Sequence, residues 1–323
     1  MPTLKYRHAC WDNCVFLNGR YQFKSKIKKF NIVNFAHNCS KKKFCLMLFL
    51  FDKIRKLMIM NTKLTKREIY YQIKSYVRNQ SIIDNTLKNI SNILDVGLWD
   101  LNILAQRGLV YGNMHLKLSS GEIINCNVPG TAIPMDINDI IKIKTAAYFI
   151  LVVEKESVFH KLIEEDFPNT LAIPFVLITG KGYPNYNTQL FLKKLYTVMS
   201  VPVFILVDPD PYGIHIMFTY RFGCRTSAHI SEYLTITNAK WLGVFPSEIS
   251  KMSMSAEELN KKDKNLIQDL LKYPHLSEYP KMREELQILL DHNYKAEIEG
   301  FVNNFNYFSR IYLLEKFIEK AFI

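Results

Sequence analysis

Three acidic residues follow buried, strand-like segments of the chain. Glu154 ends the apolar run Tyr148–Val153, and Asp208 and Asp210 come directly after the apolar run Val203–Val207. Strand-like and helix-like patterns alternate through this region, which predicts a parallel α/β sheet. Functional groups in such sheets gather at the carboxyl ends of the strands, so we expect the three carboxylates to meet at one edge.

Carboxylates that are held together repel one another, and the repulsion raises their pKa values. A hard divalent cation relieves this conflict, and Mg²⁺, with its preference for oxygen ligands and retained water, suits such a set. The alternative is that each acidic residue caps the start of a helix, because Asp and Glu are common in first turns. All three at successive strand ends, two of them with Asp-x-Asp spacing, favour a metal site made of Glu154, Asp208 and Asp210.

Two adjacent tyrosines, Tyr70 and Tyr71, lie in the first turns of a helix that Thr65 and Glu68 mark as a capping box. Tyrosine can act as a covalent nucleophile toward phosphorus, but a pKa near 10 leaves only about one part in 10³ ionised at pH 7. A nucleophilic tyrosine therefore needs a base, a cation or a metal beside it. Arg67 precedes Tyr71 by one turn on the same face and can stabilise phenolate or phosphate charge. The alternative is one core and one surface aromatic residue, with Arg67 solvated.

The elements around these tyrosines follow a helical pattern. Residues 41–60 predict one helix, the capping box starts a second, and Ser81 with Asp84 marks a third. Gly112-Asn113 then separates two strand-like segments and predicts a two-residue hairpin. Three short helices followed by a hairpin predict a winged helix.

A glycine-rich turn, Gly180-Lys181-Gly182-Tyr183-Pro184, joins a predicted strand to a predicted helix. It is not a phosphate-binding Walker loop, because the required glycine and Lys-Ser/Thr spacing is missing. The simplest interpretation is an ordinary turn, although Lys181 can still reach a phosphate from that edge.

Positive charge is concentrated in the first quarter of the chain. Residues 1–80 hold 18 Lys and Arg against 3 Asp and Glu, a net of +15, whereas residues 81–323 carry a net of −3. This asymmetry predicts a polyanionic partner, nucleic acid or a membrane surface. The longest apolar run, Phe44–Phe51, is far shorter than the ~20 residues that span a bilayer, so we expect a soluble protein. Residues 1–29 loosely resemble a transit peptide but lack its serine enrichment, which favours a floppy, DNA-facing basic arm.

Several ordered motifs together resemble one family, the meiotic double-strand-break transesterases of the sporulation-eleven type, which are relatives of the A subunit of DNA topoisomerase VI. The resemblance extends from about residue 30 to the C-terminus. The motifs that carry it are Arg67-Glu68-Ile69-Tyr70-Tyr71, Val153-Glu154-Lys155-Glu156, Gly180-Lys181-Gly182-Tyr183-Pro184, Asp208-Pro209-Asp210-Pro211-Tyr212-Gly213, Trp241-Leu242-Gly243-Val244-Phe245-Pro246-Ser247 and Lys295-Ala296-Glu297-Ile298-Glu299.

The resemblance implies a winged-helix (CAP-like) domain over residues 30–140 and a Toprim α/β domain with C-terminal helices over residues 141–323, after the basic arm 1–29. It implies that Tyr71 attacks double-stranded DNA and becomes joined to a 5′ end, with Arg67 and Lys181 on phosphate. Tyr70 then contacts DNA or packs.

The family's metal motifs map onto Glu154, Asp208 and Asp210, with Mg²⁺ as the cofactor and Mn²⁺ as a substitute. The implied active site is composite: the tyrosine of one protomer meets the Toprim domain of another in a homodimer or pseudo-dimer. The expected partners are other meiotic break proteins and a topoisomerase VI B-like subunit, and the expected location is the nucleus, on chromosomes.

Other functions are compatible with the same residues. A dimeric DNA-binding scaffold that organises break formation would not cut DNA. A Toprim nuclease would cleave without Tyr71. The A subunit of a complete type IIB topoisomerase would need a second, ATP-binding subunit, because no ATPase motif is present in this sequence.

Overall fold

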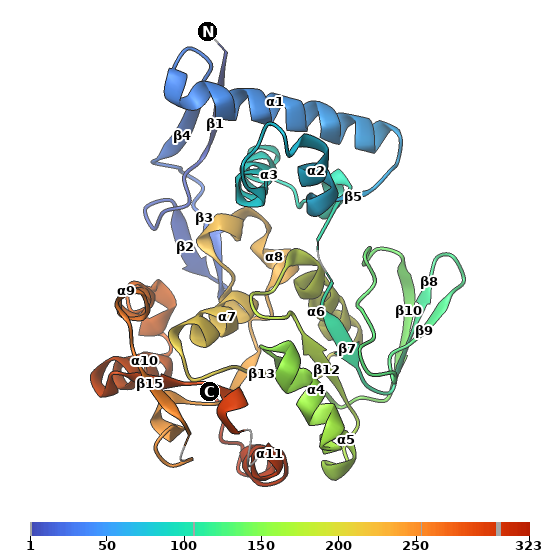
Figure 1. Ribbon diagram of the computed structural model, residues 1–323, viewed down its shortest axis with the longest axis vertical. Coiled ribbons are helices and arrows are strands. Elements are labelled where there is room, and N and C mark those ends of the chain that lie inside the picture. The colour runs from blue at the N-terminus through green and yellow to red at the C-terminus, as the bar shows by residue number, and fades with distance from the viewer. Residues whose placement is uncertain (1, 106, 253, 302–304) are drawn as a thin grey trace. The chain divides into compact units, whose positions relative to one another are not determined.

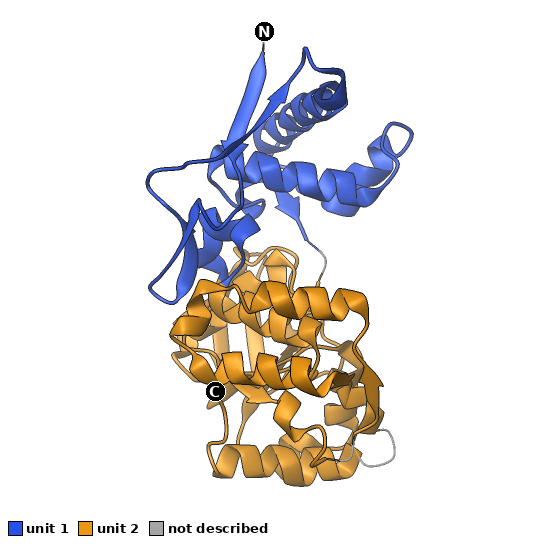
Figure 2. Cartoon of the chain, turned by 90° about the vertical axis from the view of Figure 1, so that its left-hand side faces the viewer, with its two compact units in different colours: residues 1–106, 223–234 blue, residues 107–222, 235–323 orange. Residues whose placement is uncertain are grey.

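The chain forms two compact units, coloured separately in Figure 2. Unit 1 contains the chain up to residue 106 and the segment Gly223–Leu234, here called the late segment. Unit 2 contains Arg107–Phe222 and Thr235–Ile323. The computed structural model describes four stretches of the chain: residues 2–105, 107–252, 254–301 and 305–323.

Unit 1 combines short strands with helices (Figure 1). Its elements are, in chain order, β1 (Thr3–Arg7), β2 (Cys14–Leu17), β3 (Arg20–Phe23), β4 (Phe30–Asn34), α1 (Asn38–Ile59), β5 (Leu64–Thr65), α2 (Lys66–Ile73), α3 (Gln80–Leu94), a 3-10 turn (Trp99–Leu101), β6 (Ile103–Leu104), a 3-10 helix (Arg225–Ile230) and α8 (Ser231–Leu234).

The three predicted helices are present, and α1 differs from its prediction in one respect. The apolar residues of the sequence pattern, which predict the core-facing stripe of this helix, include Leu48 and Met58. In the structure these two residues are 49% and 52% exposed. Each follows a core residue directly, and one residue turns the helix by about 100°, which moves its side chain off the stripe. The buried residues of α1 are Phe44, Met47, Leu50, Ile54 and Leu57. Within the described stretches, no helix is both long and apolar enough to cross a membrane.

The capping box of α2 is formed as predicted. Thr65 Oγ1 accepts from Glu68 N at 3.1 Å, and Glu68 Oε2 accepts from Thr65 N at 2.6 Å. These two bonds satisfy backbone donors at the helix start and fix where α2 begins. The third helix starts slightly earlier than predicted, because Asn79 rather than Ser81 stands at its N-cap.

The first residues of the chain are folded, in contrast to the floppy arm expected from their composition. Strand β1 pairs antiparallel with β4, and β2 pairs antiparallel with β3. Asn13 is fully buried between them: its Nδ2 donates to His8 O and Lys29 O, while its Oδ1 accepts from Lys28 N and Lys29 N. Strands of four or five residues do not stand out in the sequence, because their order depends on partners elsewhere in the chain.

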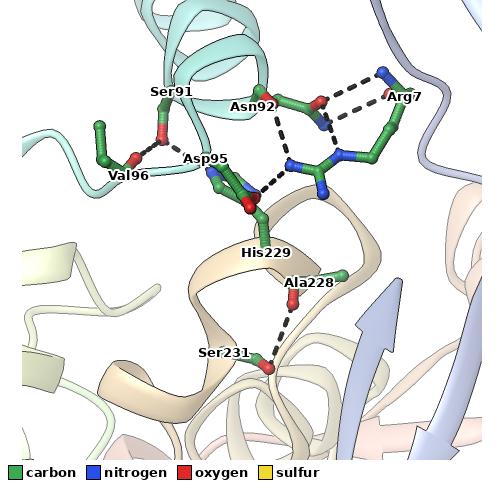
Figure 3. A network of polar contacts seen from close by, with 8 residues as sticks. All are labelled: Arg7, Ser91, Asn92, Asp95, Val96, Ala228, His229 and Ser231. Carbon is green, nitrogen blue, oxygen red and sulfur yellow. Dashed lines mark hydrogen bonds and ion pairs between the residues drawn. The ribbon is translucent and has the colours of Figure 1, made fainter. Parts of the chain in front are cut away.

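Polar contacts fasten β1 to α3, and α3 to the late segment, as Figure 3 shows. Arg7 N donates to Asn92 Oδ1 at 3.1 Å, and the Arg7 guanidinium forms an ion pair with Asp95. His229 Nε2 lies 2.8 Å from Ser91 Oγ. Burial, with a smaller effect of Arg7, lowers the pKa of His229 to about 4, so the ring is neutral at pH 7.

Unit 2 is a mixed α/β unit with helices at its C-terminal end (Figure 1). Its strands are β7 (Leu109–Tyr111), β8 (Met114–Leu118), β9 (Ile123–Asn125), β10 (Ile140–Thr145), β11 (Phe149–Val153), β12 (Phe175–Thr179), β13 (Val203–Leu206), β14 (Lys240–Gly243), β15 (Ala256–Glu258) and β16 (Tyr294–Ala296). Its helices are α4 (Glu156–Glu164), α5 (Phe167–Thr170), α6 (Tyr186–Met199), α7 (Pro211–Phe222), α9 (Lys261–Leu270), α10 (Pro280–His292), α11 (Phe305–Tyr307) and α12 (Leu313–Ile318), with short 3-10 turns at Pro246–Glu248, Pro274–Ser277 and Ile298–Phe301 and a π-helical turn at Phe308–Tyr312.

The central sheet of unit 2 has the order β14-β13-β11-β12-β7, and its first four strands are parallel. The predicted parallel α/β sheet is therefore confirmed. From β11 the chain moves to β12 on one side through α4, and then back past β11 to β13 through α6. Right-handed crossovers in opposite directions place α4 on one face of the sheet and α6 and α7 on the other. Alternate residues of β11 fill both faces, since Leu151 and Ile150 are both fully buried.

The predicted wing is wrong in its pairing. The Gly112-Asn113 dipeptide does not close a hairpin, because β7 pairs with β12 as the antiparallel edge of the central sheet. Strand β8 pairs instead with β9 and β10 in a separate three-stranded sheet. These strands belong to unit 2, so the boundary that we expected between residues 140 and 141 falls near residue 106. Two neighbouring apolar runs cannot reveal that a third, distant strand offers a better partner.

Replacing Asn13 by alanine should loosen the N-terminal strands. The change would leave buried backbone groups at His8, Lys28 and Lys29 without their partner, which we expect to cost at least about 2 kcal/mol locally. Hydrogen exchange of β1–β4 should accelerate in Asn13→Ala but not in Asn31→Ala, a control on β4 of the same region. Unchanged protection in Asn13→Ala would contradict this account of how the strands are held.

Candidate active site

Tyr71 lies on the exposed face of α2. The helix buries Ile69 and Ile73, and Tyr71 on the other side is 55% exposed. Arg67 Nε donates to the Tyr71 hydroxyl at 3.3 Å, and the guanidinium carbon lies 5.7 Å from the centre of the Tyr71 ring. This hydrogen bond, followed by the charge of Arg67, lowers the pKa of Tyr71. The structure thus places beside Tyr71 the cation that a nucleophilic tyrosine would need.

Tyr70 is placed differently from its neighbour. Its side chain is half-buried, its hydroxyl donates to Arg78 O at 3.5 Å, and its ring centre is 5.7 Å from that of Tyr71. The hydroxyl of Tyr70 is directed at the backbone carbonyl of Arg78, whereas Tyr71 is exposed and its hydroxyl lies beside a guanidinium. This difference suits Tyr71 better than Tyr70 for attack on an external phosphate.

Glu154 and Asp208 meet at the edge of the central sheet where its parallel strands end. Together with Asp210 they form what is here called the carboxylate edge. Strands β11 and β13 are neighbours in register, with Val153 opposite Leu206, so the residues that follow them come together. Asp208 N donates to Glu154 Oε2 at 3.1 Å. Asp210 begins the turn into α7, where its Oδ1 accepts from Gly213 N at 2.5 Å.

Gly213 is required where α7 approaches this edge. A Cβ atom on residue 213 would lie 2.4 Å from Asp208 O and 2.9 Å from Glu154 Oε2. Both contacts are shorter than a carbon can make with oxygen, so any other residue would push α7 away from the carboxylates. The Asp-x-Asp motif and the glycine that follows it therefore work as one packed turn.

The pKa values of Glu154, Asp208 and Asp210 are raised at this edge, so these groups ionise less readily than free carboxyl groups. Burial raises the pKa of Glu154 to about 8, with smaller effects of Asp208 and Asp210. Burial likewise raises the pKa of Asp210 to about 7, and it raises the pKa of Asp208. Buried carboxylates with raised pKa values are typical of functional sites, although ion-pair networks also produce them.

Lys155, to which the sequence motifs give no separate role, forms an ion pair at this edge. Its Nζ lies 2.8 Å from Asp208 Oδ2 and 2.9 Å from a carboxylate oxygen of both Glu297 and Glu299. Burial alone would lower the pKa of Lys155, but these bonds outweigh it and raise the pKa. Ile298 N also donates to Asp208 Oδ1 at 2.9 Å. The motif Lys295–Glu299 was recognised only as part of the resemblance, and its contact with Asp208 is a tertiary one.

Lys181 lies on the turn after β12 in a left-handed conformation, with φ of 62°. Its Nζ pairs with Glu156 Oε1 at 2.8 Å, and its backbone N donates to Thr179 Oγ1 at 3.1 Å. The turn is fastened to the carboxylate edge, because Gly182 N donates to Glu154 O at 2.8 Å. The turn that carries Lys181 is therefore bonded to the backbone of Glu154, whereas the Lys181 side chain pairs with Glu156.

The carboxylate oxygens are suitable ligands for a hard divalent cation, but the three side chains are only partly arranged to bind one. Glu154 is a buried oxygen donor and Asp210 a partly buried one, and burial raises the pKa of both. A divalent ion would offset the cost of ionising them. Asp208, however, is turned to Lys155. Accordingly, within the described stretches no three His, Cys, Asp or Glu side chains are arranged to hold a metal ion. A cation bound by all three would have to draw Asp208 away from Lys155.

Two known protein families match this chain, and their matches include the residues of the site. The family described as the Toprim domain of Spo11 and of the topoisomerase 6 A subunit matches residues 149–317, and that described as "Type IIB DNA topoisomerase" matches residues 42–103. The first match contains the whole carboxylate edge, and the second contains α2 with Arg67 and Tyr71. Unit 2 therefore contains a Toprim domain, a class that generally binds divalent metal.

Relatives match along most of the chain. The human meiotic recombination protein SPO11 is 38% identical over 285 residues, which cover 86% of this chain and 72% of the relative. The Drosophila melanogaster meiotic recombination protein W68 is 34% identical, covering 86% and 84%. The A subunit of DNA topoisomerase 6 from Arabidopsis thaliana is 31% identical, covering 86% and 66%. The chain belongs to the family of Spo11 and the topoisomerase 6 A subunit.

Replacing Glu154 by glutamine should change how stability depends on pH. Between about pH 4.5 and 8 the folded protein keeps a proton on Glu154 that the unfolded chain has lost, so the free energy of unfolding of the cation-free protein falls as pH rises. Glutamine cannot ionise, so Glu154→Gln should show a shallower fall. The raised pKa values of Asp210 and Asp208 contribute to the fall that remains.

Denaturant unfolding at pH 5.5 and 8.5 in the presence of a chelator measures this slope. Glu164→Gln, at an exposed glutamate of α4, is the matched control and should behave as the unchanged protein does. Equal slopes in Glu154→Gln and the control would show that the Glu154 carboxyl does not carry the burial penalty assigned to it.

Proposed function

We propose that this chain is a DNA transesterase of the type IIB topoisomerase-like class that forms meiotic double-strand breaks and so initiates homologous recombination. The observation that carries the proposal is the contact between Arg67 and an exposed Tyr71, in a chain that also holds a buried carboxylate edge. Membership of the family, with two relatives named as meiotic recombination proteins, supports the same function.

The proposed chemistry exchanges one phosphate ester for another. The Tyr71 oxygen attacks a backbone phosphorus, a new P–O bond forms to the tyrosine, and the P–O3′ bond breaks. The phenol proton passes to the departing O3′ by way of solvent, which leaves a 3′ hydroxyl and a 5′-phosphotyrosyl end. No water is consumed, so the break keeps the energy of the ester and remains chemically reversible.

Arg67, Lys181 and Tyr70 have separate tasks in this scheme. Arg67 stabilises the phenolate before attack and the phosphate charge that develops during it. Lys181 contacts the DNA phosphate from the edge of the central sheet after exchanging its bond with Glu156. Tyr70 supports the DNA contact and is not the nucleophile, because its hydroxyl is directed at Arg78 O.

Glu154, Asp208 and Asp210 would hold Mg²⁺, with Mn²⁺ as a substitute. The ion would supply positive charge to the reacting phosphate. The residues of the chain prepare this site: Gly213 lets α7 approach, and Asp208 N holds Glu154 Oε2 at the edge. Lys155 keeps Asp208 neutralised until a stronger cation competes for it.

The active assembly in this proposal contains two copies of the chain, or a pseudo-dimer. Tyr71 of one copy acts with the carboxylates of the other, so each break in duplex DNA needs two composite sites. Other meiotic break proteins and a topoisomerase VI B-like subunit complete the complex, which acts in the nucleus on chromosomes. The 31% identity to the A subunit of a DNA topoisomerase 6 keeps a complete type IIB topoisomerase as the second candidate.

Replacing Tyr71 by phenylalanine should abolish the covalent protein–DNA adduct. The substitution removes the attacking oxygen and keeps the ring, so DNA binding should persist. Adducts to end-labelled duplex DNA can be counted on denaturing gels, in reactions supplemented with partner proteins or in meiotic cells. Tyr70→Phe removes the neighbouring hydroxyl and should retain at least part of the adduct.

The outcomes separate the remaining functions. Adduct that survives in Tyr71→Phe would contradict the assignment of the nucleophile. Cleavage without any adduct, unchanged in Tyr71→Phe, would indicate a Toprim nuclease that uses water. DNA binding without cleavage in the unchanged protein, when its partners are present, would indicate a scaffold.

A further inference from the structure

Tyr220 carries a hydroxyl that the fold buries and leaves without a bond. The residue lies near the end of α7, and its side chain is 1% exposed. Across the stretches that the structure describes, its hydroxyl has no hydrogen-bond partner. Buried hydroxyls without a partner are uncommon and destabilising, so such a group calls for a physical explanation.

The hydroxyl lies on the loop that supports Glu154. A Cβ atom on residue 180 would be only 2.6 Å from the Tyr220 hydroxyl, so the glycine there makes room for it. The same loop holds the Glu154 backbone: Thr179 Oγ1 donates to Glu154 O at 3.1 Å, and Gly182 N donates to it at 2.8 Å. Burial, followed by the negative charge of Glu154, raises the pKa of Tyr220.

The helix directs Tyr220 toward the same edge. Tyr220 follows Gly213 by seven residues, which is two turns of α7, so both lie on one face. Side chains in helices lean toward the N-terminal end, and that end of α7 packs on Asp208 and Glu154 through Gly213. The Tyr220 hydroxyl is therefore an unused donor on the face of α7 that carries Gly213, whereas Asp208 N already donates to Glu154 Oε2.

We propose that Tyr220 is a positioning residue that donates its hydroxyl hydrogen bond to Glu154 when that carboxylate holds a divalent cation. The inference rests on the metal half of the proposed function and adds a residue to it. Donors behind a metal-binding carboxylate fix its orientation, and their removal typically weakens metal binding by about 10- to 100-fold. Without the cation the hydroxyl has no partner among the described residues.

Tyr220→Phe tests this proposal through two quantities: cation affinity, which should fall, and the melting temperature of the cation-free protein, which should not fall. Calorimetric titration of the cation-free full chain with Mg²⁺, and then with Mn²⁺, should give a dissociation constant about 10-fold higher, equivalent to about 1.4 kcal/mol. The melting temperature of the cation-free variant should be unchanged or higher, because the substitution deletes a buried hydroxyl that has no partner. Neither measurement depends on DNA cleavage.

Tyr312→Phe is the matched control in the same unit. The Tyr312 hydroxyl donates to Glu248 Oε2 at 2.7 Å, so its loss should lower the melting temperature and leave cation affinity unchanged. The expected pattern of the control is therefore the reverse of that for Tyr220→Phe.

Cation affinity that is equal or tighter in Tyr220→Phe would overturn the inference while the proposed function stands. Weaker affinity together with a lower cation-free melting temperature would also overturn it, because the hydroxyl would then be a structural group. If the unchanged protein binds neither cation, the inference fails together with the metal half of the proposed function. The adduct through Tyr71 tests the other half independently.

Discussion

The main constraint at the carboxylate edge is the cost of holding negatively charged carboxylates close together where burial excludes most of the water. Neighbouring parallel strands bring Glu154 and Asp208 into hydrogen-bond contact, and the turn into α7 adds Asp210. Burial makes their ionisation costly, and DNA would bring still more negative charge. The fold meets part of this demand with Lys155 on Asp208 and leaves the rest to protons or to a cation. A polyanionic substrate can approach such an edge only after its charge is offset.

Tyr71 presents the opposite problem, because its hydroxyl must lose a proton rather than keep one. An exposed phenol is protonated at pH 7, and it needs positive charge to become a nucleophile. The capping box of α2 fixes the helix start, so Arg67 and Tyr71 are held one turn apart and form the observed hydrogen bond. Basic charge is concentrated in this part of the sequence, where the proposed reaction would bind phosphate, whereas the carboxylates lie in the slightly acidic remainder. The change in the sign of the charge along the chain therefore follows the division between the proposed nucleophile and the carboxylates.

Local rules predicted the parts of this site that depend on short segments. Thr65 and Glu68 identify the start of α2, and apolar runs followed by acidic residues identify the parallel strands and their shared edge. Long-range choices were not predictable in this way. Strand β7 pairs with β12 rather than β8, Asn13 orders the N-terminal strands through four distant backbone groups, and Lys155 reaches Glu297 and Glu299 late in the chain. Each depends on a partner that only the folded chain brings near.

The most direct test of the account asks whether Tyr71 and the carboxylates of two different copies form one site. Chains carrying Tyr71→Phe are combined with chains carrying Asp208→Asn and Asp210→Asn, with different tags so that mixed dimers can be isolated and supplied with partner proteins and duplex DNA. A composite site predicts one intact site per mixed dimer, and hence single-strand nicks with a 5′ end joined to Tyr71 of the aspartate-substituted chain. Mixed dimers that bind DNA and form no adduct would contradict the account.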